Sequence, residues 1–135
     1  MVATPMAPVE VVLVEDDAVI RRSVRRALVG CGASVREFAT AEDALEHLKP
    51  DAVDLLITDL RLPGLDGLSL ATAARARGCR CRVILITGSY DIDDEARRCA
   101  LGPEHIEILH KPFSLSAVTA LVTSCRGGDP RDRPT

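Results

Sequence analysis

Five short apolar runs alternate with segments of helical periodicity along this chain, and that alternation limits the folds open to it more than any other feature. The apolar runs are Val9–Val14, Ala33–Phe38, Val53–Thr58, Arg82–Thr87 and Ile106–Leu109. The third and fourth runs, VDLLIT and RVILIT, are almost continuously apolar, as strands buried on both faces of a parallel sheet are. The alternation therefore predicts an α/β fold, a five-stranded parallel sheet with helices on both faces and right-handed crossovers.

The segments between and after these runs carry apolar residues at helical spacing, which predicts five helices. In chain order, their apolar faces include Val24 and Leu28, Ala44 and Leu45, Leu70 and Ala74, Ile92 and Ala96, and Val118 and Val122. Thr40 and Ser114 precede two of these segments and are predicted N-caps, because their hydroxyls can accept hydrogen bonds from free backbone N–H groups. In LPGLDG, Gly64 and Gly67 are both predicted to be turn glycines.

Three carboxylates stand side by side where the first apolar run ends, in the sequence VLVEDD. Glu15, Asp16 and Asp17 repel one another, and repulsion between neighbouring carboxylates raises the pKa of at least one of them. One interpretation is that Asp16 or Asp17 only caps the helix that follows. The other is that the cluster faces a positive partner at the carboxyl edge of the sheet, where doubly wound proteins form their sites.

Three further strands deliver polar side chains to the same edge. Asp59 follows the third apolar run, Thr87 ends the fourth and Lys111 follows the fifth. Several carboxylates together are suitable ligands for a hard divalent cation such as Mg2+. An ammonium group and a hydroxyl beside that cation can hold an anionic group, which is the arrangement that phosphoryl transfer needs. Asp59 is then the candidate nucleophile, because a carboxylate can itself accept a phosphoryl group.

Four stretches of the sequence, VLVEDD, TDLRLPGLDG, ILITG and HKPF, together resemble the receiver domains of two-component response regulators. The resemblance covers about residues 9–125 and implies a flavodoxin-like doubly wound (βα)5 fold with strand order 2-1-3-4-5. Residues 1–8 are then an N-terminal extension, and the polar tail 126–135, rich in Gly and Pro, is predicted to be flexible. The expected location is the cytoplasm, because neither a secretory signal nor a membrane-length apolar stretch is recognisable.

The resemblance implies that Asp59 is the phosphoacceptor and that Mg2+ binds beside it. Asp16 would bind the cation directly, and Glu15 would bind it through water. Asp59 itself and the main-chain carbonyl of Arg61 would complete the set of protein ligands.

Four further positions take their roles from the same resemblance. Thr87 would be the switch hydroxyl that contacts the phosphoryl group, and Lys111 would be the cation that pairs with that group. Pro112 would follow a cis peptide bond. Ile108 occupies the switch position, where the family usually has an aromatic residue. Isoleucine is branched at Cβ and stiff at χ1, so this position has no ring to swing inward.

The function expected from the resemblance is that of a single-domain response regulator in a bacterial two-component or phosphorelay system. It would accept a phosphoryl group from a histidine kinase or a histidine phosphotransfer protein, and no turnover of a separate substrate is expected. Three alternatives stay open: the receiver part of a DNA-binding regulator, a receiver that binds partners without phosphorylation, and a flavodoxin-like module for FMN or another small molecule. The acidic loop VEDDAVI counts against the last, because it lacks the glycines or hydroxyls that cradle a phosphate.

Two surfaces are candidates for partner binding. Arg21, Arg22, Arg25 and Arg26 form a basic face on the first helix, which is either a solvated face or a docking surface for the phosphodonor protein. The fifth helix carries no charge over Ser114–Cys125, although 27% of the chain is charged. By resemblance, the fourth helix, fifth strand and fifth helix would bind an effector or a second copy. The net charge of −3 gives no reason to expect direct binding to nucleic acid or to a membrane.

Overall fold

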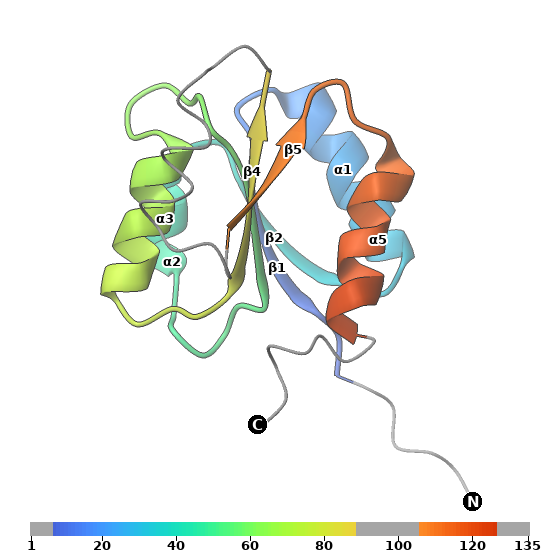
Figure 1. The fold of residues 1–135 in the computed structure, drawn as a ribbon, viewed down its shortest axis with the longest axis horizontal. Helices are drawn as coiled ribbons and strands as arrows, with labels where there is room; N and C mark the ends of the chain where they lie inside the picture. The colour runs from blue at the N-terminus through green and yellow to red at the C-terminus, as the bar shows by residue number, and fades with distance from the viewer. Residues whose placement is uncertain (1–6, 89–105, 127–135) are drawn as a thin grey trace, which may run out of the picture.

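The structure, a computed structural model, describes residues 7–88 and 106–126 of the chain (Figure 1). Its elements are β1 (Glu10–Val14), α1 (Ala18–Gly30), β2 (Ser34–Phe38), α2 (Ala41–His47), β3 (Leu55–Asp59), α3 (Gly67–Ala76), β4 (Arg82–Thr87), β5 (Ile106–His110) and α5 (Leu115–Arg126). The predicted helix that contains Ile92 and Ala96 lies outside the described residues, as do nearly all of the predicted extension and tail. Among the helices that are described, none is both long enough and apolar enough to cross a membrane.

The five strands form one parallel sheet in the order β2-β1-β3-β4-β5, which confirms the predicted fold. This is the flavodoxin-like order, in which the chain moves from β1 to β2 and then crosses to the other side of β1. The central strand β3 pairs with β1 and β4, so that Val14 lies beside Thr58 and Asp59 lies beside Ile86. In β4 and β5, Thr87 lies beside His110. The carboxyl ends of these strands therefore share one edge of the sheet.

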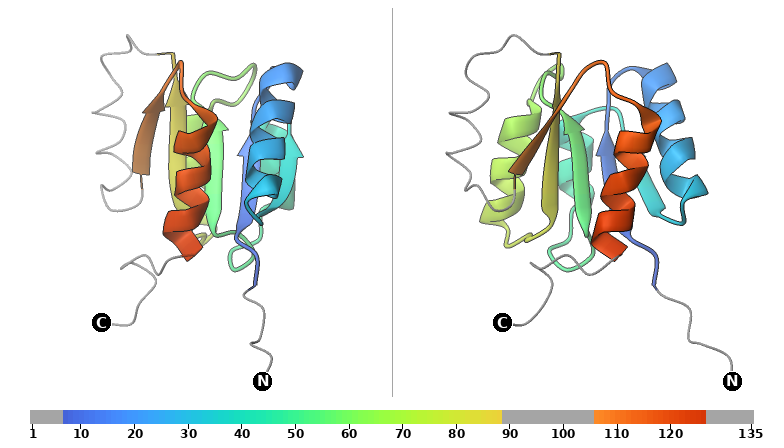
Figure 2. Two further views of the ribbon diagram at one scale, coloured as in Figure 1. Left: turned by 90° about the vertical axis from the view of Figure 1, so that its right-hand side faces the viewer. Right: turned by 45° about the vertical axis from the view of Figure 1, so that its right-hand side comes forward.

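Helices α1 and α5 cover one face of the sheet, and α2 and α3 cover the other (Figure 1, Figure 2). Alternate residues of the strands enter two apolar clusters, one on each face. In β4, Val83 and Leu85 pack on the side of α2 and α3, whereas Ile84 and Ile86 pack on the side of α1 and α5. Every residue of β3 is buried as well. This burial on both faces explains why the two corresponding runs of sequence are almost continuously apolar.

Side-chain caps fix where the helices begin. The carboxylate of Asp17 accepts hydrogen bonds from the N–H groups of Val19 and Ile20, at 2.9 and 3.1 Å, and so caps α1. The hydroxyls of Thr40 and Ser114 each accept a bond from the N–H group three residues later, at 3.1 Å, so both predicted N-caps are confirmed. Of the three neighbouring carboxylates, Asp17 thus caps α1, and Glu15 and Asp16 are left to form a site at the edge of the sheet.

The prediction that both glycines of LPGLDG are turn glycines is right for Gly64 and wrong for Gly67. Gly64 has a φ of +78°, a left-handed conformation that glycine adopts without strain. Gly67 is instead the first residue of α3. A Cβ atom at position 67 would lie 2.1 Å from the main-chain oxygen of Asp59. The missing side chain therefore lets α3 begin directly against the end of β3.

Replacing Gly67 by alanine should destabilise the fold, although alanine favours helices. The added Cβ would push the start of α3 away from Asp59, and overpacking of this kind costs about 1–3 kcal/mol. Gly30→Ala is the matched control, because no atom beyond its own helix and chain neighbours lies within 4 Å of the added Cβ. That variant should keep the free energy of unfolding or raise it by up to about 1 kcal/mol. Urea unfolding measures both, and two variants of equal stability would contradict this role for Gly67.

Candidate metal centre

The structure brings Glu15, Asp16 and Asp59 together at the carboxyl edge of the sheet. Glu15 and Asp16 follow β1 and Asp59 ends β3, and these two strands are neighbours. One carboxylate oxygen of each residue lies within 4.8 Å of the other two. Glu15 and Asp59 are only 2% and 6% exposed, whereas Asp16 lies at the surface. The cluster is therefore closed by the core behind it and open to solvent on the side of Asp16.

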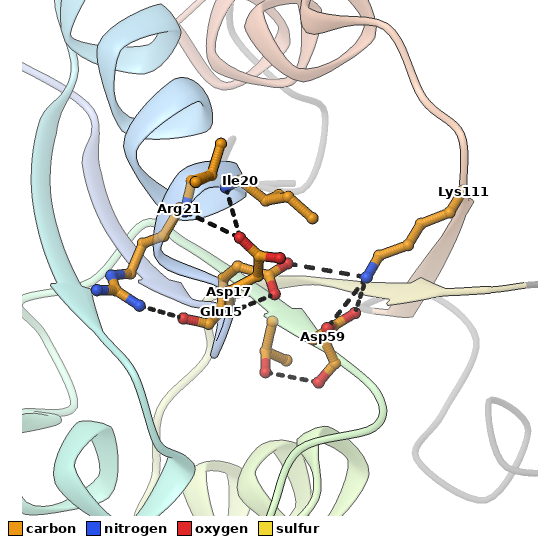
Figure 3. A network of polar contacts seen from close by, with 8 residues as sticks. Glu15, Asp17, Ile20, Arg21, Asp59 and Lys111 are labelled. Atoms are coloured by element: carbon orange, nitrogen blue, oxygen red, sulfur yellow. Dashed lines mark hydrogen bonds and ion pairs between the residues drawn. The ribbon is translucent and has the colours of Figure 1, made fainter.

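Lys111 supplies a positive charge to this cluster (Figure 3). Its Nζ lies 3.1 and 3.2 Å from the two carboxylate oxygens of Asp59, and 3.9 Å from Oε1 of Glu15. The main-chain N–H of Lys111 donates to the carbonyl of Thr87 at 2.8 Å, which ties the end of β5 to the end of β4. The peptide bond between Lys111 and Pro112 is cis. One lysine thus bridges carboxylates that two other strands deliver.

The other residues singled out from the sequence lie around this cluster. Thr87 is buried at the end of β4, where its carbonyl accepts the hydrogen bond from Lys111. Arg61 lies in the loop between β3 and α3, two residues after Asp59. Ile108 is partly buried in β5 and packs against the apolar cluster on the side of α2 and α3. The sheet therefore places Thr87 beside Lys111, and the roles of Arg61 and Ile108 stay predictions.

Burial controls the protonation of the cluster. It raises the pKa of Glu15 to about 7, although a hydrogen bond from the N–H group of Asp17 lowers that pKa. Burial also raises the pKa of Asp59 above its ordinary value, while the hydrogen bond and charge of Lys111 act in the opposite direction. For Lys111, burial lowers the pKa, but the contact with Asp59 outweighs it and the pKa is raised. Three carboxylates against one ammonium leave the cluster short of positive charge.

The donor atoms of the cluster fit a hard divalent cation. Oε1 of Glu15 is fully buried and accepts no hydrogen bond from the described residues. A buried carboxylate oxygen without such a partner is costly, and a cation beside it would remove that cost. Mg2+ takes oxygen ligands and keeps several of its waters, so a cluster of three carboxylates can hold it. The residues at this edge therefore fit the Mg2+ site that the sequence predicts.

Three contacts that hold the site were not anticipated from the sequence. Nη1 of Arg21, on α1, donates a hydrogen bond of 2.7 Å to the main-chain carbonyl of Glu15 (Figure 3), and Nε of Arg21 pairs with Glu37 of β2 at 3.2 Å. On the other side of the cluster, the carboxylate of Glu42 accepts a hydrogen bond of 3.1 Å from the N–H group of Leu65. That bond fastens the loop between β3 and α3 to α2. The opposite charges at positions 21 and 37 were the only signal in the sequence for any of these three contacts.

An open parallel sheet in the order 2-1-3-4-5, with carboxylates and a lysine gathered at its carboxyl edge, defines a flavodoxin-like α/β protein with an acidic site whose donor atoms fit a cation. The family model of the response regulator receiver domain matches residues 11–123 of the chain. The chain therefore belongs to the response regulator receiver family, which works in two-component signalling. This confirms the family that the four sequence motifs resemble.

Comparisons with known proteins agree with this family. The chain is 34% identical over 110 residues to the DNA-binding transcriptional regulator NtrC of Klebsiella pneumoniae, and the match covers 82% of the chain but only 23% of NtrC. It is 36% identical over 103 residues to nodulation protein W of Bradyrhizobium diazoefficiens, covering 76% of the chain and 44% of that protein. A CheY-like receiver domain protein of Methanospirillum hungatei shares the fold, with a TM-score of 0.82 at 20% identity over 94% of the chain and 100% of that structure. The chain thus spans less than half the length of either curated relative.

The raised pKa of Glu15 should make the stability of the metal-free chain depend on pH. The native pKa of about 7 exceeds the ordinary value of 4.5, so the native state keeps a proton that the unfolded chain has already lost. The stabilisation from this proton is complete below pH 4.5 and is lost as the pH rises to about 7. In a chelator, the free energy of unfolding should therefore fall over this range, by at most about 1.4 kcal/mol per pH unit for this one group.

Glu15→Gln removes the titrating group and should flatten much of this slope. The variant should keep a smaller slope, because burial raises the pKa of Asp59 as well. Glu46→Gln, at an exposed position of α2, is the matched control and should keep the wild-type slope. Urea unfolding at a series of pH values measures all three chains. If wild type and Glu15→Gln share one slope, the buried titration does not occur at Glu15.

Proposed function

We propose that this receiver domain accepts a phosphoryl group on Asp59, with Mg2+ bound beside it, and signals by binding partners or by relaying the phosphate. The donor would be a histidine kinase or a histidine phosphotransfer protein. The observation that carries the proposal is the setting of Asp59, a buried carboxylate in contact with Lys111 and clustered with Glu15 and Asp16. The proposal implies no turnover of a separate substrate.

Each residue of the cluster has a role in the proposed transfer. An oxygen of Asp59 attacks the phosphorus atom and forms a P–O bond, while the P–N bond to the donor histidine breaks. Lys111 stabilises the ionised form of Asp59 before the transfer and can pair with a phosphoryl oxygen after it. Glu15, Asp16, Asp59 and the main-chain carbonyl of Arg61 would hold Mg2+. Bound Mg2+ would neutralise charge on the phosphoryl oxygens.

Thr87, rather than Ile108, would transmit the phosphorylation to the surface. The hydroxyl of Thr87 is assigned to the phosphoryl group, because Thr87 ends β4 next to Lys111. Ile108 already packs against the apolar cluster, and its χ1 angle has few alternatives. The change would therefore pass through the backbone after Thr87, where Gly88 gives conformational freedom, with little change of rotamer at Ile108.

The surface that responds would include α5. This helix has no charged residue before Arg126, and Leu115 at its start is 46% exposed. The hydroxyls of Thr119 and Thr123 donate to main-chain carbonyls about one turn earlier, at 3.1 and 3.3 Å, so they are satisfied within the helix. A helix surface of this composition suits an effector or a second copy of the chain better than it suits water. Phosphorylation would change the affinity for that partner.

A second candidate is the receiver part of a longer DNA-binding regulator. NtrC is a DNA-binding transcriptional regulator, and the region similar to this chain makes up 23% of it. The two candidates share their phosphoryl chemistry and differ in what responds to it. Immunoblotting of the native protein separates them, since a band near 14.5 kDa supports a single-domain regulator and a much larger band supports the second candidate.

Incubation with acetyl phosphate and Mg2+ should add one phosphoryl group to the chain, which intact mass spectrometry measures. Asp59→Asn should abolish the mass gain because the nucleophilic carboxylate is gone. Asp43→Asn, which removes an exposed carboxylate at the start of α2, should keep it. Excess chelator should suppress labelling of the wild type. Labelling of Asp59→Asn, or labelling that persists in chelator, would show that the site is wrongly assigned.

Mg2+ should also stabilise the fold, because it relieves the repulsion among the three carboxylates. A ligand that binds only the native state adds about 1.4 kcal/mol to the free energy of unfolding at roughly ten times its dissociation constant. Asp16→Ala should lose this response. Asp17→Ser should keep it, since serine can replace aspartate as the N-cap of α1. Thermal unfolding with and without Mg2+ tests both variants. A wild-type melting temperature that does not change when Mg2+ is added would count against the metal site.

A further inference from the structure

Arg21 occupies a position where a helix does not favour a cation. It lies near the amino end of α1, next to the positive end of the helix dipole. Its side chain is nevertheless mostly buried, at 19% exposure, and reaches back past the start of the helix. Nη1 donates to the main-chain carbonyl of Glu15 at 2.7 Å, and Nε donates to Glu37 at 3.2 Å. One guanidinium thus joins the loop after β1 to the edge strand β2.

These contacts bear on Asp16, the surface member of the carboxylate cluster. The carbonyl that Arg21 contacts belongs to the peptide group between Glu15 and Asp16. The N–H group of Glu15 donates to the carbonyl of Phe38 at 3.1 Å, and the N–H group of Asp17 donates to Oε2 of Glu15 at 3.1 Å. The backbone is therefore fixed on both sides of Asp16. Arg21 therefore holds the orientation of the peptide group that precedes Asp16.

The charge of Arg21 does not explain its position. A cation this close to the cluster would repel Mg2+, so charge alone would weaken metal binding. Glu37 reduces that effect, because its two carboxylate oxygens pair with Arg21 and Arg25 at 3.2 and 2.7 Å. Both arginines share this partner, and in the described part of the chain the contact with the Glu15 carbonyl is made by Arg21.

We propose that Arg21 is a positioning residue for the metal site, which orients the Glu15–Asp16 peptide group so that Asp16 is preorganised to bind Mg2+. The inference rests on the proposed Mg2+-dependent function of this site. The inference predicts the direction in which the Mg2+ affinity changes when Arg21 is removed. If Arg21 acted by charge alone, its removal would strengthen Mg2+ binding, whereas loss of preorganisation weakens it.

Isothermal titration calorimetry of the full chain with Mg2+ alone separates these possibilities. Arg21→Met keeps an unbranched stem and removes both hydrogen bonds. We expect its dissociation constant for Mg2+ to rise about tenfold, the lower end of the effect of residues that orient metal ligands. Arg25→Met is the matched control, because it loses the pair with Glu37 but leaves the Glu15 carbonyl bonded, and it should bind Mg2+ as the wild type does.

The rate of phosphorylation by acetyl phosphate gives a second measurement. Its dependence on Mg2+ concentration would not change if Arg21 only stabilised the fold. Arg21→Met should need about tenfold more Mg2+ for its half-maximal rate, yet reach the wild-type rate when Mg2+ is saturating. A loss of fold stability alone would leave the half-maximal Mg2+ concentration unchanged. If Arg21→Met does not fold, Arg21→Gln, which removes the positive charge and shortens the side chain, gives the same test and should also weaken Mg2+ binding relative to Arg25→Met.

The outcomes distinguish this inference from the function on which it rests. An unchanged or tighter Mg2+ affinity in Arg21→Met, or in Arg21→Gln where that variant is used, would overturn the positioning role and leave the proposed function standing. Failure of the wild type to bind Mg2+ would overturn the proposed metal site, and the positioning role with it.

Discussion

The pairing of two buried carboxylates with one lysine is the interaction on which the rest of the structure depends. Glu15 and Asp59 end neighbouring strands, and Lys111 reaches both of them from the far side of β4. Charges removed from water are costly unless they are paired, so β1, β3 and β5 must bring their ends to one edge. A parallel sheet does this without further structure, because the carboxyl ends of its strands coincide. The apolar strands therefore fill the core and also set the distances between the acids and the lysine.

The main chain at Asp59 is held as tightly as its side chain. Its carbonyl oxygen accepts a hydrogen bond of 2.9 Å from the hydroxyl of Thr58, and α3 begins against the same oxygen at Gly67. The N–H group of Leu60 donates to the carbonyl of Ile86 in β4 at 2.7 Å. The proposed phosphoryl transfer depends on a reacting group with little freedom, and these contacts hold the main chain at Asp59 from three directions.

Much of the fold and the candidate site was predictable, because the signals were local side-chain patterns. Continuous apolar runs marked β3 and β4, and the acids and lysine that follow such runs marked the edge of the sheet. Contacts with the main chain left no such pattern. The sequence around Gly67 predicts a turn glycine, because nothing in its neighbours reveals the carbonyl of Asp59 against it. Arg21 resembled three other arginines on α1, because its partner is a carbonyl that every residue possesses. Only geometry decided that Asp17 caps α1.

The contact between Arg21 and position 15 runs through the main chain, and this has a consequence for how such a domain evolves. Exchange of glutamate for aspartate at position 15 would leave the contacted carbonyl in place, whereas loss of the carboxylate at position 37 would release the arginine. Selection on metal affinity would therefore couple positions 21 and 37, whereas position 15 would need only to keep a carboxylate. Covariation between a helix and an edge strand would then carry information about a cation that neither residue touches.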